Sequence, residues 1–229
     1  MTIELAVRLA EIILGFAIFQ QSLEFMRGQQ SEKMLGIFRA LLAILLMLGF
    51  LPLLIESALL VTAVMLIRRF QGPYNGGSDT MTVLVLLCLW LSHIAPTRYW
   101  QEIALGYLAI QLTLSYFQSG WVKVVNPEWC SGRALQQVFA LSAYPVSENV
   151  RLWAGRPQVM RAMSWLVMVF ELLFPLALFN QTLLTIALSI AALFHLANAC
   201  LFGLNRFFWI WPAAFPVILW FQLRLMTVF

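Results

Sequence analysis

Apolar residues fill most of the chain, and short groups of polar or turn-forming residues interrupt them at intervals. A helix rises 1.5 Å per residue, so about 20 apolar residues cross the ~30 Å hydrocarbon core of a bilayer. The pattern predicts about eight helices. They are expected at residues 3–25, in two parts of 35–69, and at 80–95, 103–119, 161–179, 182–203 and 207–228.

Prolines and polar clusters mark the expected helix ends. The apolar stretch 35–69 is too long for one crossing, and Pro52 near its middle predicts a turn. Further breaks are expected in the turn-rich segment 71–79, in the polar and aromatic segment 97–102, and at Pro175.

The longest region that is not apolar covers residues 120–160. Within it, segment 133–142 has the pattern of an amphipathic helix lying at the membrane interface. We expect 120–160 to be a loop region that contains this helix, caps one end of the bundle and closes a polar cavity.

Composition gives the same fold class. Hydrophobic residues make up 62% of the 229 residues and charged residues 10%, and the mean hydropathy is +0.86. A soluble domain carries about 25% charged residues, so it could not bury this much apolar surface. We therefore predict an all-α, polytopic transmembrane helix bundle that forms a single domain over residues 1–229.

The net charge of +4 comes without a basic run, so it does not indicate binding to nucleic acid. With eight crossings, Arg98 and Arg224 fall on one side of the membrane and most other basic residues on the opposite side. The positive-inside rule makes that opposite side cytoplasmic. The basic residues on this predicted cytoplasmic side are Arg27, Lys33, Arg39, Arg68, Arg69, Lys123, Arg133, Arg151, Arg156, Arg161 and Arg206.

Ionisable and polar residues at membrane depth are costly, which makes them candidates for function. Five lie in apolar segments: Glu56, His93, Glu171, His195 and Asn198. His195 and Asn198 are three apart and share a helix face. Alternatively, such residues form hydrogen bonds between helices and have no role beyond holding the bundle together. No metal-ligand spacing occurs, so no metal site is expected.

Lys123 lies at the end of the helix expected at 103–119. A lysine in this position often extends its ammonium group to the membrane interface and has no other role. A lysine enclosed in a dry pocket gives up its proton more readily and can act as a base. Both interpretations of Lys123 remain open at this point.

Two blocks of sequence resemble the vitamin K-dependent γ-carboxylase and its bacterial relatives, the HTTM (horizontally transferred transmembrane) proteins. The first block is YFQSGWVKVVNPEWCSGRAL, with Tyr116, Phe117, Gly120, Lys123, Trp129 and Gly132 in matching order. The second is FHLANACLFGLNRFFW, with His195, Asn198, Leu201 and Phe202 in register.

The resemblance implies that Lys123 is the base that deprotonates a reduced quinone similar to vitamin K hydroquinone, with O₂ and CO₂ as co-reactants. His195 is expected to act beside it. The family's other catalytic histidine corresponds to Arg98, which can stabilise an oxyanion but cannot shuttle a proton. The expected cofactor-binding residues are His93, Trp129, Glu171 and Asn198.

The resemblance further implies a quinone-linked enzyme of a bacterial inner (plasma) membrane that modifies a peptide or small protein, with membrane lipids around it. The soluble domain of the eukaryotic carboxylase does not occur in these 229 residues, so a soluble or membrane partner subunit is expected. Two alternatives are open. One is a non-catalytic membrane anchor or assembly subunit, and the other is a small quinone-binding redox protein.

Overall fold

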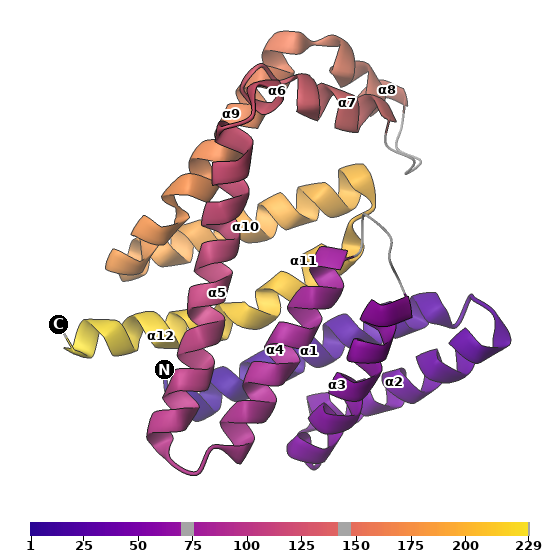
Figure 1. The fold of residues 1–229 in the computed structure, drawn as a ribbon, viewed down its shortest axis with the longest axis vertical. Helices are drawn as coiled ribbons and strands as arrows, with labels where there is room; N and C mark the ends of the chain where they lie inside the picture. Colours follow the sequence, from indigo (N-terminus) through magenta and orange to yellow (C-terminus); the bar gives the residue numbers. More distant parts are fainter. Residues whose placement is uncertain (70–75, 142–147, 229) are drawn as a thin grey trace. The chain divides into compact units, whose positions relative to one another are not determined.

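The computed structural model describes residues 1–69, 76–141 and 148–228, and within these ranges the chain forms helices joined by short turns, with no strand (Figure 1). The predicted all-α class is therefore confirmed. Contacts divide the chain into two compact units. The first unit comprises Met1–Ile110 and the chain from Asn205 onward, and the second unit comprises Gln111–Leu204. The prediction of a single domain stays a prediction.

The first unit is built on the helix pair α1 (Ile3–Phe25) and α2 (Gln30–Leu48), which lie side by side in Figure 1. Small residues allow the two backbones to approach, since a Cβ on Gly15 would lie 3.0 Å from the carbonyl oxygen of Ala43. The unit also contains α3, α4, the first half of α5, α11, η3 and α12. Their bounds are Pro52–Arg69, Gly76–Ile94, Arg98–Val124, Asn205–Ile210, Trp211–Ala214 and Phe215–Val228.

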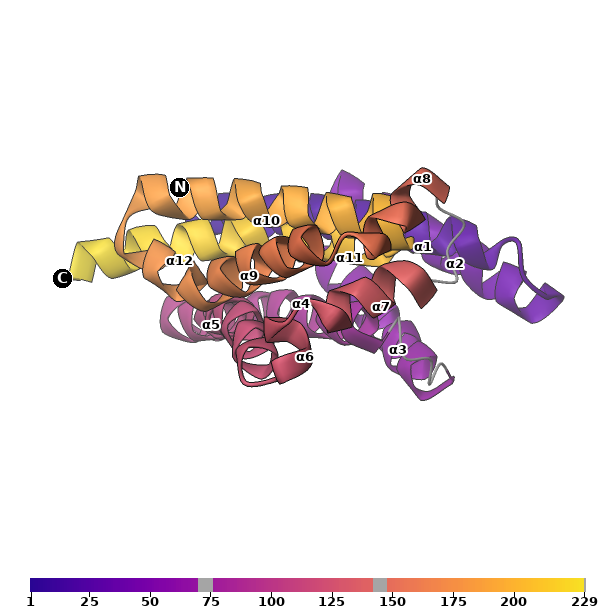
Figure 2. The same cartoon turned by 90° about the horizontal axis from the view of Figure 1, so that it is seen from above.

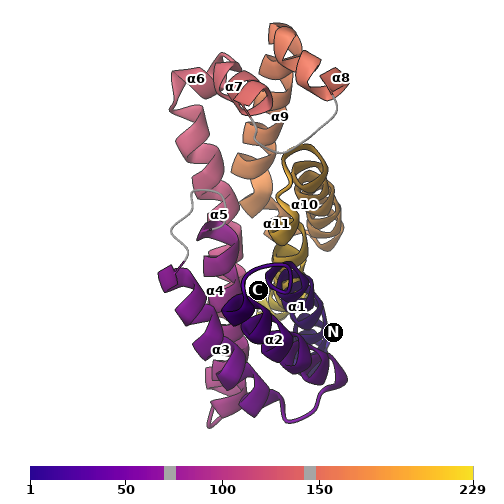
Figure 3. The same ribbon diagram turned by 90° about the vertical axis from the view of Figure 1, so that its right-hand side faces the viewer.

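The second unit begins with the last part of α5, and α9 turns through η2 into α10 (Figure 2). Short helices connect α5 to α9, and α6 and α7 lie across the N-terminal part of α9 (Figure 3). A small apolar core between α7 and α9 consists of Leu135, Phe139 and Met160. The bounds are α6 Pro127–Cys130, α7 Arg133–Leu141, α8 Glu148–Arg151, η1 Leu152–Gly155, α9 Pro157–Leu173, η2 Phe174–Phe179 and α10 Gln181–Phe202.

The predicted long helices occur, except that the helix expected at 207–228 is divided into α11, η3 and α12, and the predicted short helix at 133–142 is α7. Three further details are different. The expected turn at 97–102 is wrong, because α5 begins at Arg98 and its first turn carries the i,i+4 ion pair Arg98–Glu102. Residues 120–124 continue α5 instead of opening a loop. Of the expected loop 71–79, residues 76–79 form the first turn of α4, and 71–75 lie outside the described residues.

Four of the described helical segments are long and apolar enough to cross a membrane: Gly77–Ile94, Pro157–Phe179, Gln181–Phe202 and Asn205–Thr227. Charged side chains reduce the apolar character of the other long helices, as Glu4, Arg8 and Glu11 do in α1. Arg39, expected among the basic residues beside the membrane, is fully buried within α2. The predicted sidedness depends on eight crossings and stays a prediction.

Candidate functional site

Lys123 lies in the last turn of α5, and its ammonium group contacts a buried carboxylate from α9. The Nζ atom donates to both oxygens of Glu171, at 2.7 Å to Oε1 and 2.6 Å to Oε2, and to Oγ of Ser119 at 2.6 Å. Ser119 Oγ in turn donates to Oε1 of Glu171 at 3.1 Å. The side chain of Glu171 is 3% exposed and that of Lys123 is 16% exposed, so the lysine forms the accessible side of the pair.

A glycine allows α5 and α9 to approach closely enough for this ion pair to form. A Cβ on Gly120 would lie 2.9 Å from Cβ of Glu171 and 2.9 Å from the backbone nitrogen of Leu172. Gly120 stands one turn before Lys123, at the point where the two helices meet. Any larger residue there would push the Glu171 backbone away from the lysine.

Trp129 completes the surroundings of the ammonium group. Its ring centroid lies 5.5 Å from Nζ of Lys123, within the range of a cation–π interaction. Short helix α6 carries the ring, and Asn126 caps that helix by accepting from the backbone nitrogen of Glu128 at 2.9 Å. Ser164 of α9 donates to the carbonyl oxygen of Trp129 at 2.6 Å. The backbone of Trp129 is therefore held from both α6 and α9.

His195 lies in α10 and belongs to a neighbouring aromatic cluster in the same unit. Its Nε2 is 2.9 Å from the hydroxyl of Tyr116 on α5, and the imidazole is 4% exposed. The Tyr116 ring stacks on Phe174 with centroids 4.2 Å apart. The His195 ring is tilted against Tyr116 at a centroid distance of 6.0 Å. His195 thus holds α10 to α5 through a buried hydrogen bond.

Asn198 lies one turn beyond His195 on α10 and is half-buried. The backbone carbonyl oxygen of Asn198 accepts from the backbone nitrogen of Gly203 and, at 3.3 Å, from that of Leu204, where the helix ends. The expected shared face with His195 is present, because both residues are on one regular helix.

Arg98 and His93 belong to the first unit, so the structure does not group them with Lys123. Arg98 forms ion pairs with Glu4 and, at 3.6 Å, with Glu102. Its side chain is 51% exposed. Lys123 and Arg98 stand near opposite ends of α5, and each has its own acidic partners.

His93, near the end of α4, meets two buried glutamates. Its Nε2 is 2.7 Å from Oε1 of Glu11 on α1 and 3.7 Å from Oε1 of Glu56 on α3. Arg8 donates to the other oxygen of Glu11 at 2.7 Å, and to the carbonyl oxygen of Leu46 at 2.8 Å. Sequence reasoning named Glu56 and His93 but did not predict that Glu11 joins them.

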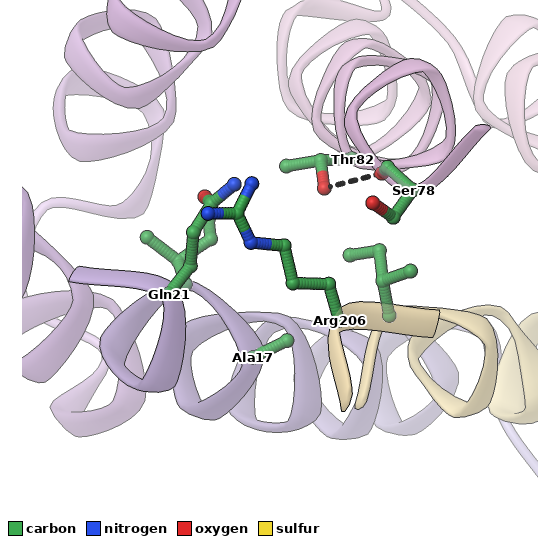
Figure 4. A pocket seen from close by; sticks show the side chains of 7 residues that line it. Ala17, Gln21, Ser78, Thr82 and Arg206 are labelled. Atoms are coloured by element: carbon green, nitrogen blue, oxygen red, sulfur yellow. Dashed lines mark hydrogen bonds between the residues drawn. The ribbon is translucent and has the colours of Figure 1, made fainter. Parts of the chain in front are cut away.

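A buried polar network in the first unit does not follow from the sequence pattern. Arg39 donates to Oε1 of Gln21 at 2.9 Å, and Nε2 of Gln21 donates to Asp79 at 2.9 Å. Arg206 lies 3.8 Å from Asp79 and borders a cavity of about 10 Å³, shown in Figure 4. A volume of this size holds about one water molecule. Polar residues inside otherwise apolar segments are the signal, but charge counting places Arg39 at the membrane surface and the turn residues around Asp79 predict a loop.

The cluster around Lys123 in the second unit and the cluster around His93 in the first unit differ in chemistry. In the second unit, a lysine, a carboxylate and a serine hydroxyl are arranged for proton transfer between Nζ and the Glu171 oxygens, with one aromatic ring over the cation. In the first unit, two carboxylates and an imidazole converge. Of the predicted site residues, the structure brings together Lys123, Glu171 and Trp129, and it links His195 to Tyr116, which lies one turn before Ser119 on α5.

Comparison with known proteins agrees with the resemblance. The model of the HTTM domain family matches residues 90–222, a span that includes Lys123, Glu171 and His195. No curated protein and no solved structure matches the chain. The match covers more than half of the chain. The protein therefore belongs to the HTTM domain family, and its four apolar helices make it an integral membrane protein.

Proposed function

We propose that this member of the HTTM family is a quinone-linked membrane enzyme in which Lys123, coupled to Glu171, removes a proton from a bound quinol. The observation that carries this proposal is the position of Nζ, within 2.7 Å of both Glu171 oxygens and 5.5 Å from the Trp129 ring centroid. The family is related to the vitamin K-dependent carboxylase, whose corresponding lysine has this role.

A lysine can act as a base only after it has lost its own proton. Glu171 accepts that proton within the pair, because its oxygens lie at hydrogen-bonding distance from Nζ. The ammonium and carboxylate then become a neutral amine and a neutral acid. Ser119 remains bound to both partners, so the geometry is kept while the proton moves. The low dielectric of a buried site makes the neutral form accessible.

The amine then takes up a proton from the group that it faces. Glu171 is almost closed to its surroundings, whereas Lys123 keeps 16% of its side chain exposed, so a quinol hydroxyl reaches the amine from the lysine side. When bound with O₂ and CO₂, a reduced naphthoquinone supplies the oxidative chemistry that carboxylation of a glutamate requires. The residues present fit such a group, since base, proton acceptor and aromatic ring are all in place.

Arg98 is not needed in this scheme. The histidine that the carboxylase carries at the matching position has a proton-transfer role that a guanidinium cannot perform. Here Glu171 takes that role beside Lys123, and Arg98 is engaged by Glu4 and Glu102. We propose a peptide or small protein as the second substrate, delivered by a partner subunit.

The experiment measures O₂ uptake by the purified protein in mild detergent after addition of a reduced naphthoquinone. We expect protein-dependent uptake that Lys123→Ala abolishes. Lys123→Arg is the sharper variant, because arginine keeps the charge and the pairing with Glu171 but does not give up its proton. It should bind quinone and fail in O₂ uptake.

Lys33 provides the matched control, because it is the other lysine of the sequence and is exposed on α2. Lys33→Ala should behave as the wild type. Full O₂ uptake by Lys123→Arg would contradict the role of Lys123 as base. Organic extraction and mass spectrometry of each variant separate the remaining readings. Bound quinone without any peptide-dependent reaction favours a redox protein, and no quinone at all favours an assembly subunit.

A further inference from the structure

A second cluster lies in the first unit and has no part in the function proposed above. Helices α1, α3 and α4 each contribute one residue to it: Glu11, Glu56 and His93. One potential ligand atom from each residue lies within 4.8 Å of the other two. Of the three, His93 alone falls within residues 90–222, so the arrangement is not what the family match describes.

Glu56 carries the strongest indication that something is bound there. Its side chain is completely buried, and neither Oε1 nor Oε2 has a hydrogen-bond partner among the described residues. Oε1 is 3.7 Å from Nε2 of His93, so the carboxylate faces the other two residues. A buried carboxylate without a partner is costly, and such groups are stabilised by a proton or by a cation.

The surroundings of Glu11 resemble those of a metal ligand held by an outer shell. Arg8 donates to Oε2 of Glu11 at 2.7 Å and to backbone carbonyls at the end of α2, including that of Leu46 at 2.8 Å. Oε1 is thereby left facing Nε2 of His93 at 2.7 Å. Outer hydrogen bonds of this kind orient carboxylate ligands in metal sites.

The formal charges also leave room for a cation. Two carboxylates and the Arg8 guanidinium sum to a single negative charge when His93 is neutral. A divalent ion would reverse that sign, and a bound hydroxide would bring the cluster to neutrality. No second basic residue is paired with these carboxylates among the described residues.

We propose that Glu11, Glu56 and His93 bind a divalent first-row transition metal ion, with water completing its coordination. Imidazole and carboxylate together suit Zn²⁺, Mn²⁺ or Fe²⁺ better than Mg²⁺ or Ca²⁺. Two ligand atoms that share a zinc ion are separated by about 4 Å at most. Glu56 therefore has to move slightly inward, and His93 Nε2 and Glu11 Oε1, now 2.7 Å apart, have to separate slightly to admit the ion. The ion takes the place of the hydrogen bond between His93 Nε2 and Glu11 Oε1, and it competes with protons because it binds a neutral imidazole and ionised carboxylates.

The site would fix three helices of the first unit to one another, and His93, with 24% of its side chain exposed, provides the route of entry. The test uses the full chain in mild detergent, stripped with a chelator and titrated with Zn²⁺ by calorimetry and with Co²⁺ by visible absorption. We expect one ion per chain, and a Co²⁺ spectrum that shows nitrogen and oxygen ligands. Binding should weaken as pH falls.

Glu56→Gln removes the negative charge with almost no change in volume, and His93→Gln removes the imidazole. Each should weaken Zn²⁺ binding by at least about tenfold, as losses around metal sites commonly do. Glu4→Gln is the matched control, since it removes an exposed carboxylate from the same helix as Glu11. It should bind Zn²⁺ as the wild type does.

Two binding results would overturn the proposal. One is wild-type protein that takes up no Zn²⁺ or Co²⁺ after stripping, and the other is Glu56→Gln protein that binds as tightly as the Glu4→Gln control. A failure of Glu56→Gln to fold would leave the Co²⁺ spectrum of the wild type as the deciding measurement, and a spectrum without a nitrogen ligand would also reject the site. Neither measurement involves quinone, so the result is independent of the role of Lys123.

Discussion

The two units each bury a glutamate at the centre of a charged cluster, but they compensate its charge differently. Glu171 of the second unit has a cation within 2.7 Å of both oxygens and a serine hydroxyl at 3.1 Å. Glu56 of the first unit is equally buried, and no hydrogen bond from the described residues reaches it. The imidazole Nε2 of His93 lies 3.7 Å from Oε1 of Glu56.

The difference indicates two kinds of chemistry. A closed carboxylate–ammonium pair can exchange a proton internally and needs no further ligand. An open carboxylate beside another carboxylate and an imidazole needs a proton or a metal ion from outside. In both cases the polar groups are expensive in an apolar chain, and they are kept where function compensates for the cost.

The difference between the two clusters is tested most directly by removing the carboxylate from the closed pair, Lys123 and Glu171. Glu171→Leu would leave Lys123 charged beside an apolar side chain. Breaking a buried ion pair by deleting one partner costs about 3–5 kcal/mol. We expect a loss near the lower end of that range, because Lys123 is partly exposed. The measurement is the free energy of unfolding, from SDS titration of the protein in mild detergent.

The double variant Lys123→Met with Glu171→Leu is the control for this prediction. Replacing a whole buried pair by apolar residues of similar size is often neutral or stabilising. Most of the lost stability should therefore return in the double variant. If Glu171→Leu alone unfolds no more easily than the wild type, the carboxylate does not compensate Lys123 in the membrane protein.

A smaller perturbation leaves both charges in place and separates their helices. Gly120→Ala would put a Cβ 2.9 Å from Cβ of Glu171, so α5 and α9 must shift apart. Overpacking of this kind costs about 1–3 kcal/mol, and O₂ uptake with reduced naphthoquinone should fall as well. Gly155→Ala is the matched control, because a Cβ there meets nothing within 4 Å. Equal behaviour of the two variants would show that the helices tolerate a wider spacing.

Sequence alone was sufficient for the helices and for part of the second unit. Long apolar runs bounded by Pro52 and Pro175 predict where helices stop, since proline interrupts the backbone hydrogen bonds in any surroundings. The resemblance of one block of sequence to the HTTM proteins also pointed to Lys123 and Trp129, which are only six residues apart. The ends of α5 were missed because polar residues at a helix end look like a loop in a hydropathy pattern.

The first unit shows what hydropathy cannot reveal. Glu11, Glu56 and His93 come from three helices, and the rotation of each helix about its axis decides whether they meet. Charge counting placed Arg39 at a membrane surface, but it is buried against Gln21 and Thr62. Neither result follows from local pattern, because both depend on packing between helices far apart in sequence.

In the open cluster, which consists of Glu11, Glu56 and His93, removal of the Glu56 carboxylate should raise stability instead of lowering it. In the metal-free protein, Glu56→Leu takes away a buried carboxylate that has no partner, so stability should rise by about 1 kcal/mol. Zn²⁺ should then stabilise the wild type and leave Glu56→Leu unchanged. Thermal unfolding with and without Zn²⁺ measures both effects. A loss of stability in the chelated Glu56→Leu protein would contradict this account, since it would mean that Glu56 is already well compensated.

The smallest change in stability is expected for the hydrogen-bonded pair Tyr116 and His195 in the second unit. Tyr116→Phe keeps the ring stacked on Phe174 and removes only the hydroxyl that meets His195 Nε2 at 2.9 Å. Hydrogen bonds between membrane helices contribute roughly 0.6 kcal/mol on average, so the unfolding free energy should change by about that amount. Tyr99→Phe, at a tyrosine that is 66% exposed, is the control. A loss several times larger would mean that His195 depends on Tyr116 for its orientation, and this hydrogen-bonded pair would then belong with the Lys123–Glu171 pair as one coupled proton system.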